Sequence, residues 1–72
     1  LNLKEVTLPS SLDSIGSLAF FGCISLSNIS IPSSTRTIED EAFASCYMLE
    51  TIKMPGTILV VGKNAFKDCK SQ

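Results

Sequence analysis

Residues 26–48 read LSNISIPSSTRTIEDEAFASCYM, and the residues on both sides contain two further copies of this stretch in register. When the sequence is shifted against itself by 23 positions, five columns hold the same residue in all three copies. These columns are Leu3, Leu26 and Leu49; Pro9, Pro32 and Pro55; Ala19, Ala42 and Ala65; Phe20, Phe43 and Phe66; and Cys23, Cys46 and Cys69. At background residue frequencies of roughly a tenth or less, five such columns do not arise by chance. The sequence therefore predicts three 23-residue repeats.

Each copy begins with a pattern that predicts a short β-strand with one buried face. In the middle copy, Ile29 and Ile31 alternate with the polar residues Asn28 and Ser30. A period of two is typical of a half-buried strand. The same pattern predicts inward side chains at four positions of the outer copies: Val6, Leu8, Ile52 and Met54. The proline that follows in each copy lacks the amide proton that a continuing sheet needs, so the strand is predicted to end there.

The second half of each copy predicts another short extended segment and then one or two helical turns. The extended segment is predicted by an aliphatic column formed by Ile15, Ile38 and Val61. Farther on, Ile38, Ala42 and Cys46 are four residues apart, which is the spacing of one face of a helix. The acidic residues 39–41 would lie at the start of that turn, where unpaired amides and the helix dipole favour negative charge.

A unit of 23 residues cannot bury its apolar side alone, whereas copies stacked in register bury a continuous core. We therefore predict a solenoid in which equivalent strands pair in parallel at roughly 4.8 Å. Equivalent residues then form columns, and the phenylalanines and cysteines form ladders inside the coil. A strand at either end would present a bare edge, which predicts edge-to-edge self-association or fraying.

The pattern L-x-x-[VI]-x-[LIM]-P-x-x-x-x-x-[IV]-x-x-x-A-F-x-x-C resembles the BspA-like, or Treponema pallidum-type, class of leucine-rich repeats over the whole chain. This resemblance implies a leucine-rich repeat solenoid with a parallel β-sheet on its concave face and the short helical turns on the other side. It also implies a secreted or cell-surface protein, since such proteins are commonly surface proteins, often adhesins, of host-associated bacteria. We expect residues 1–72 to form one segment of a longer array, with repeats at about 3–25, 26–48 and 49–71.

Three places depart from the repeat pattern. Thr35 stands in an otherwise aliphatic column, and Glu39 stands where the other two copies have glycine. Leu59 and Val60 are apolar in a region that is expected to turn. We expect these departures to change local packing and not the class of fold.

The residue types present do not assemble an active site, so we expect a non-catalytic protein without cofactors. The chain has no histidine, which removes the Ser-His-Asp and Cys-His arrangements. The acids at 39–41 are consecutive and would fan out around a turn instead of facing each other as a glycosidase pair does. A net charge of −1 provides no basic stripe for nucleic acid. No apolar run approaches the roughly 18 residues of a membrane span, so membrane insertion is not expected.

The cysteines and the acidic run raise the question of a zinc site, a disulfide or a calcium site. Cysteines that are 23 residues apart do not match the spacing of a zinc site. Rungs about 5 Å apart would permit a disulfide, but an odd number of cysteines favours small buried thiols at the end of each coil. The acids at 39–41 lack the alternating ligands and central glycine of an EF-hand calcium loop, which favours a solvated turn.

The outward strand positions form the candidate site for a protein or glycan partner. Nine polar residues would form a lattice on the concave face of the sheet, and six of them are the candidate contacts: Glu5, Thr7, Asn28, Ser30, Thr51 and Lys53. A rigid polar lattice suits a binding protein, and it is equally what a solvated sheet looks like. No large aromatic residue points outward in the three strands, so the hot-spot residues typical of interfaces are missing.

We therefore predict a non-catalytic, protein- or glycan-binding segment of a secreted or cell-surface, adhesin-like protein. One alternative is a structural spacer that displays another domain without binding. A second is an accessory region of an enzyme encoded elsewhere in a parent chain. Clustered Tyr, Trp or Arg in the outward columns of further repeats would favour binding, whereas Ser, Thr and Lys would favour the spacer.

Overall fold

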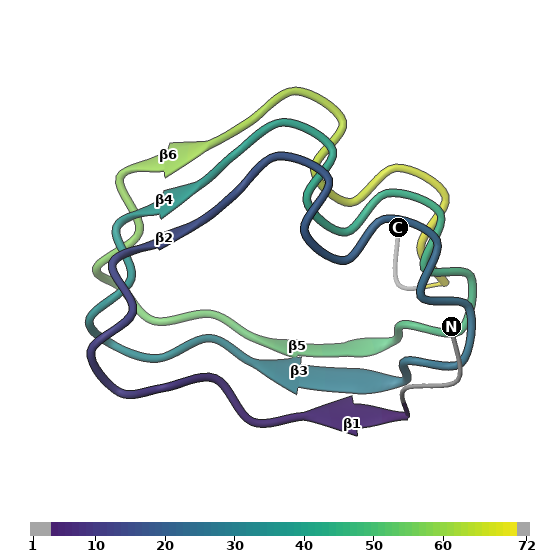
Figure 1. The fold of residues 1–72 in the computed structure, drawn as a ribbon, viewed down its shortest axis with the longest axis horizontal. Helices are drawn as coiled ribbons and strands as arrows, with labels where there is room; N and C mark the ends of the chain where they lie inside the picture. The colour runs from purple at the N-terminus through teal and green to yellow at the C-terminus, as the bar shows by residue number, and fades with distance from the viewer. Residues whose placement is uncertain (1–3, 71–72) are drawn as a thin grey trace.

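The computed structural model describes residues 4–70, which wind through stacked coils (Figure 1). We call residues 4–25 the first coil, 26–48 the middle coil and 49–70 the third coil. Each coil contributes one strand to each of two parallel sheets. The first sheet, in the order β1-β3-β5, consists of Glu5–Val6 (β1), Asn28–Ser30 (β3) and Thr51–Lys53 (β5). The second sheet, in the order β2-β4-β6, consists of Ser14–Ile15 (β2), Thr37–Ile38 (β4) and Val60–Val61 (β6).

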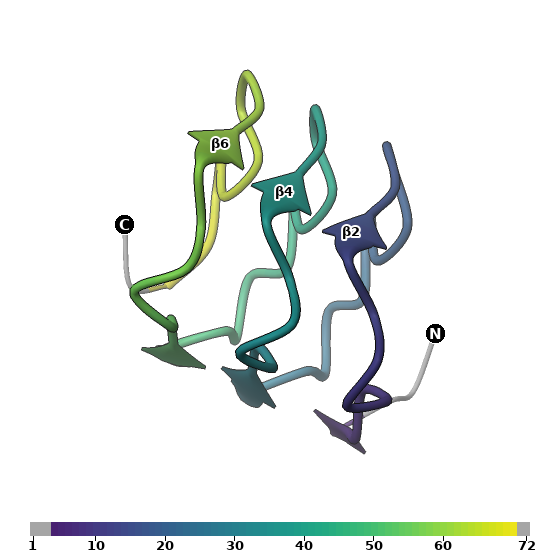
Figure 2. The ribbon, with the colours of Figure 1, turned by 90° about the vertical axis from the view of Figure 1, so that its left-hand side faces the viewer.

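Strands of neighbouring coils pair in parallel, and each pair joins residues 23 positions apart. In the first sheet, Asn28 lies opposite Glu5 on one side and opposite Thr51 on the other. In the second sheet, Ile15 lies opposite Ile38. The coils therefore lie side by side in one repeated arrangement, which Figure 2 shows with the second sheet toward the viewer. The predicted parallel pairing and the second extended segment are confirmed.

The core lies inside the coils and is most completely buried in the middle one. Ile29, Phe43 and Cys46 are at most 2% exposed. The rings of Phe20 and Phe43 stack with centroids 5.1 Å apart, and those of Phe43 and Phe66 stack with centroids 5.2 Å apart. The interplanar angles are 6° and 4°, so the predicted phenylalanine ladder is formed.

The apolar columns lose their cover in the third coil. Met54 is 44% exposed and Val61 is 49% exposed, whereas their equivalents in the middle coil, Ile31 and Ile38, are at most 4% exposed. The prediction that Met54 is buried like its equivalents is therefore wrong. The physical reason is that each coil is covered by the next, and no further coil follows within residues 4–70.

The helical turns predicted after the second strand of each coil are not formed. Residues 17–22, 40–45 and 63–68 are instead runs of turns, and residues 4–70 contain no helix. Each turn run contains two residues with φ between 58° and 71°, four positions apart: Leu18 and Gly22, Glu41 and Ser45, and Asn64 and Asp68. A right-handed helix cannot include residues in this left-handed region, so the helix is interrupted twice in every coil.

The amides of a turn run alternate between bonds within the coil and bonds to the next coil. In the middle coil, the amides of Ala42 and Ala44 donate to carbonyls three positions earlier. Between them, the Phe43 amide donates to the Ala65 carbonyl of the third coil at 2.8 Å. A helix would keep all of these bonds within one coil. The turn runs instead tie successive coils together, as the two sheets do.

Two polar residues in unexpected surroundings are satisfied by neighbouring coils. Thr35 is completely buried, and its hydroxyl donates to the Leu12 carbonyl of the first coil at 2.9 Å. This bond offsets the cost of burying a hydroxyl in an aliphatic column. In the acidic run, the Asp40 carboxylate accepts a hydrogen bond from the Lys63 amide at 2.8 Å. The prediction that the acidic run begins a helical turn is therefore wrong, and the Asp40 carboxylate instead pairs with an amide of the third coil.

Candidate functional site

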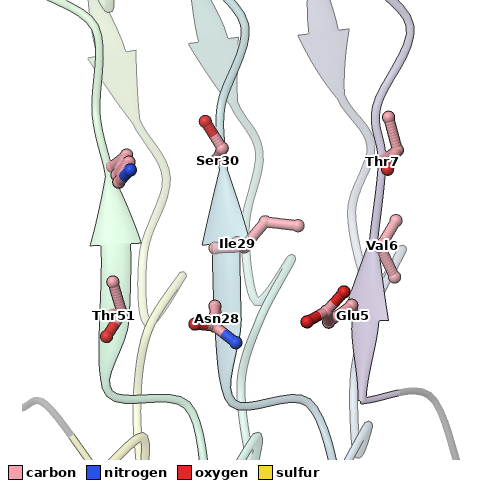
Figure 3. Close-up of a pocket in the computed structure, with 8 residues that line it drawn as sticks. Glu5, Val6, Thr7, Asn28, Ile29, Ser30 and Thr51 are labelled. Carbon is pink, nitrogen blue, oxygen red and sulfur yellow. The ribbon is translucent and has the colours of Figure 1, made fainter.

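The six residues predicted for partner binding are all exposed and lie together on the outer face of the β1-β3-β5 sheet. Glu5, Asn28 and Thr51 form one row across the three strands because they are register partners (Figure 3). Ser30 and Lys53 are partners in the second row. Thr7 continues this row just after β1, beside Ser30 (Figure 3). The predicted lattice is thus present as a geometric arrangement.

This lattice lines a shallow depression of about 210 Å³. Val6 and Ile29 complete the lining, and sequence analysis missed them because the alternation assigns both to the inner face. Ile29 is only 2% exposed and contributes little to the accessible surface, whereas Val6 is half-buried. Pockets for small molecules typically enclose roughly 300–1,000 Å³. The smaller, open hollow therefore suits contact with part of a larger partner better than enclosure of a small ligand.

The charges of the depression lie on its two outer strands. Glu5 belongs to β1 and Lys53 belongs to β5, while the middle strand supplies no charged group. On that middle strand, the Asn28 amide donates to the Ser27 hydroxyl at 3.2 Å. At the edge of the lattice, Glu50 forms an exposed ion pair with Lys70 at 3.5 Å. The surface therefore offers an acid, a base and uncharged donors and acceptors in fixed positions.

The three cysteines are free, buried thiols inside the coils. The Cys46 thiol donates to the Phe20 carbonyl at 3.1 Å, and the Cys69 thiol donates to the Phe43 carbonyl at 3.2 Å. Burial raises the pKa of Cys46 from 9.0 to about 11, and burial also raises the pKa values of Cys23 and Cys69. A protonated thiol is a poor nucleophile and a poor metal ligand. The interpretation as small buried residues is confirmed over the disulfide.

The described residues were also compared with the requirements of a metal site and of a membrane-spanning helix. Within residues 4–70, no group of three or more His, Cys, Asp or Glu side chains is placed to hold a metal ion. In the same part of the chain, no helix has the length and apolar character that crossing a membrane requires. The acidic residues 39–41 are exposed: Glu39 directly follows β4, and Asp40 and Glu41 begin the turn run of the middle coil.

Comparison with known proteins relates this architecture to one class of repeats. Residues 1–72 match the family described as BspA type leucine rich repeat region (6 copies). The fold is similar to the crystal structure of a T. pallidum leucine rich repeat protein, with a TM-score of 0.88 and 36% sequence identity. The match covers 94% of this chain and 34% of that protein, so this chain spans about a third of its length. A comparison with curated proteins gives no match.

Leucine-rich repeat domains usually mediate protein interactions and are typically non-catalytic. Those of the BspA type typically occur in surface or secreted proteins of bacteria. The family match over residues 1–72 agrees with the two parallel sheets and with the offset of 23 residues between paired strands. The chain belongs to the BspA-type leucine-rich repeat family.

Proposed function

We propose that this chain is a non-catalytic segment of a secreted or cell-surface, adhesin-like protein, and that it binds a protein partner through the outer face of the β1-β3-β5 sheet. The observation that carries the proposal is the depression of about 210 Å³, because one hollow gathers the polar residues of all three strands. Protein interaction is also the usual role of leucine-rich repeat domains.

The residues of this face are able to serve a partner because they have no part in the core. All six polar residues are exposed, whereas the inward residue of the same middle strand, Ile29, is 2% exposed. The pairing of β3 with both neighbours holds the backbone of the face in place. A surface ordered in advance loses less conformational entropy on binding.

The partner is expected to present a polar surface of mixed charge. Glu5 and Lys53 offer opposite charges on opposite strands, and Asn28 and Ser30 lie on the strand between them. A partner with a base and an acid at the matching separation would pair with both, and its polar groups would meet the neutral centre. Since no Trp, Tyr or Arg lines the depression, the affinity of this segment alone is expected to be modest.

The test replaces three residues of the face by bulky or oppositely charged residues. The variant combines Asn28→Arg, Ser30→Tyr and Lys53→Glu, all at exposed positions, so the fold should remain intact. Surface plasmon resonance on immobilised chain would be run against purified extracellular-matrix proteins, and a glycan array would be probed in parallel. The wild-type chain is expected to retain a protein of the panel, and the variant should weaken that binding at least about tenfold, or about 1.4 kcal/mol.

The matched control changes the charge elsewhere on the coils. It combines Glu39→Gln, directly after β4, with Glu41→Gln on the turn run, both at exposed positions. Asp40 is unchanged, because its carboxylate accepts a hydrogen bond from the Lys63 amide. This control is expected to bind like the wild-type chain. Loss of binding in the control alone would place the partner on the other side. Retention of glycans alone would replace the protein partner by a glycan, and no retention at all would favour the structural spacer.

A further inference from the structure

Three exposed apolar side chains lie where the turn runs lead back to the first sheet. Tyr47 and Met48 form a turn of the middle coil just before β5 and are 57% and 50% exposed. Ile24, at the position of the first coil equivalent to Tyr47, is 49% exposed. We call Ile24, Tyr47 and Met48 the apolar shelf. Single exposed apolar residues are ordinary on a protein surface, whereas a group of them on adjacent coils indicates a contact surface.

The exposure of the shelf follows from the direction of its side chains and not from a missing coil. The middle coil has a coil on each side, and Phe43 and Cys46 of that coil are 0% exposed. Tyr47 directly follows Cys46 and is nevertheless more than half exposed. The other two residues of its column, Ile24 and Lys70, are exposed as well. Side chains of this column therefore point away from the core in every coil.

An ion pair of the third coil shows what this column lies beside. The Lys70 ammonium is 3.5 Å from the Glu50 carboxylate. Lys70 is the equivalent of Tyr47, and Glu50 is the equivalent of Ser27. The coils repeat one geometry, since the ring spacings of the phenylalanine ladder are 5.1 Å at one junction and 5.2 Å at the other. The same relation in the preceding coil places Tyr47 beside Ser27.

Ser27 joins the shelf to the lattice of polar residues. Its hydroxyl accepts a hydrogen bond from the Asn28 amide at 3.2 Å. Asn28 is the first residue of β3, and its partners Glu5 and Thr51 are the first residues of β1 and β5, so the three form the row at the start of the strands (Figure 3). The shelf therefore borders the lattice on the side from which the strands begin.

We propose that the apolar shelf is the apolar part of the partner-binding surface and takes a peptide segment of the partner that carries an aromatic or long aliphatic side chain. This inference rests on the proposed function and adds to it the chemistry of the contacting segment. The side chain packs on Tyr47 and Met48, and the neighbouring peptide groups meet Ser27 and Asn28, which offer donors and acceptors.

This arrangement matches the anatomy of protein interfaces. An apolar centre enriched in aromatic residues and methionine is usually bordered by polar residues. Tyr47 and Met48 supply the first part, and the lattice supplies the second. Tyrosine is also one of the residue types that contribute most of the binding energy at interfaces. The shelf therefore provides the kind of anchor that the depression lacks.

Selection of phage-displayed random dodecapeptides on the immobilised 72-residue chain tests the proposal. Peptides enriched in Trp, Phe, Tyr and Leu relative to the starting library are expected. Fluorescence anisotropy of the synthesised peptides would then give their affinities for soluble chain. The shelf variant Tyr47→Ser with Met48→Ser should weaken binding at least about tenfold. Both positions are exposed, so the fold should remain intact, which circular dichroism would verify.

The matched control removes as many exposed apolar side chains from the other sheet. It combines Leu59→Ser and Val60→Ser, at positions 73% and 54% exposed on and beside β6. This control is expected to bind the peptides like the wild-type chain. Should the shelf variant fail to fold, Tyr47→Asp alone replaces it in the test.

The lattice variant with Asn28→Arg, Ser30→Tyr and Lys53→Glu separates this inference from the proposed function. Loss of binding in the shelf variant and in the lattice variant would support both. Loss in the lattice variant alone would overturn the shelf and leave the proposed function standing. Loss in the shelf variant alone would support the shelf and contradict binding through the lattice. Failure to select any peptide, or an equal loss in the control, would also overturn the shelf.

Discussion

Six residues with positive φ, two in each coil, direct the backbone through the turn runs. Gly22 and Asn64 are residue types that enter the left-handed region readily, whereas Leu18 and Glu41 are not. Their backbones are held there by bonds to neighbouring coils, such as the Leu18 amide to the Asp40 carbonyl at 3.3 Å. Stacking between coils therefore imposes a conformation that these two residues would not adopt alone.

Replacing Leu18 by asparagine is expected to stabilise the chain by about 1 kcal/mol, because asparagine tolerates the left-handed region at lower cost. Leu18 has a φ of 62° and is 55% exposed, so the change loses little packing. The midpoint of chemical denaturation at low protein concentration would measure the effect. Ser17→Asn is the control, since Ser17 is exposed without a positive φ and should leave the midpoint unchanged. A Leu18→Asn chain no more stable than wild type would contradict the prediction.

Cys46 is expected to react with a thiol reagent more slowly than Cys69 in the folded chain. Cys46 is 0% exposed and Cys69 is 6% exposed, and burial raises the pKa of Cys46 to about 11. At pH 8 only about a thousandth of a thiol with that pKa is ionised, and the thiolate is the reactive form. Mass spectrometry of chain labelled under native conditions would give the two rates. In denaturant the rates should become similar, and equal rates in the folded chain would refute the buried ladder.

At the scale of elements, the strands follow from the sequence and the turn runs do not. Alternation in Asn28–Ser30 predicts β3, and its outer face is the candidate site. The spacing of Ile38, Ala42 and Cys46 predicts a helix, yet Ile38 lies in β4, Ala42 lies on the turn run and Cys46 directly follows it, and all three are buried without a helix. Burial at every fourth residue is compatible with both structures. The choice depends on whether amides such as that of Phe43 bond within the coil or to the next coil.

Phe43→Ala is expected to be the most costly truncation in the phenylalanine ladder, with a loss of about 3 to 5 kcal/mol of unfolding free energy. Phe43 is 0% exposed and stacks on a phenylalanine on each side. Phe20→Ala and Phe66→Ala should each cost less, because those rings are half-buried and have one stacking neighbour. Urea denaturation of the three variants would compare them. Equal losses would mean that the stacking does not govern stability.

At the scale of the whole molecule, stability comes from the contacts between coils. The middle coil contains Ile38 and Phe43, which are fully buried. Leu49, also fully buried, begins the third coil at its junction with the middle one, and the later part of the third coil has exposed apolar residues. Leu59, Val60 and Val61 are 73%, 54% and 49% exposed. The chain is therefore least protected at its ends, as nearest-neighbour stabilisation in a repeat protein requires.

Stability is expected to fall as the pH rises from about 9 to about 11. Burial raises the pKa of Cys46 from 9.0 to about 11, and the pKa values of Cys23 and Cys69 are raised in the same direction. In this range the unfolded chain releases thiol protons that the folded chain retains, so the stabilisation is present below pH 9 and is lost toward pH 11. Urea denaturation at a series of pH values would measure the slope.

Cys46→Ala is the comparison for this pH series. The variant is less stable at every pH because it loses buried volume. Its decline between about pH 9 and pH 11 should nevertheless be shallower, since one of the three buried thiols is gone. Identical slopes for the two chains would show that Cys46 does not contribute to the alkaline loss.

The sequence by itself determined the parallel stacking, the inward columns and the polar outer face. Identical residues that recur at one spacing are buried together only when the copies stack in register, and alternation then assigns each strand residue to a face. Only the tertiary structure decided the turn runs, the complete burial of Thr35 and the exposure of Met54 and Val61. These features depend on how closely one coil approaches another and on which coils have a neighbour. A local residue pattern contains neither piece of information, because it reports periodicity along the chain and not distance across it.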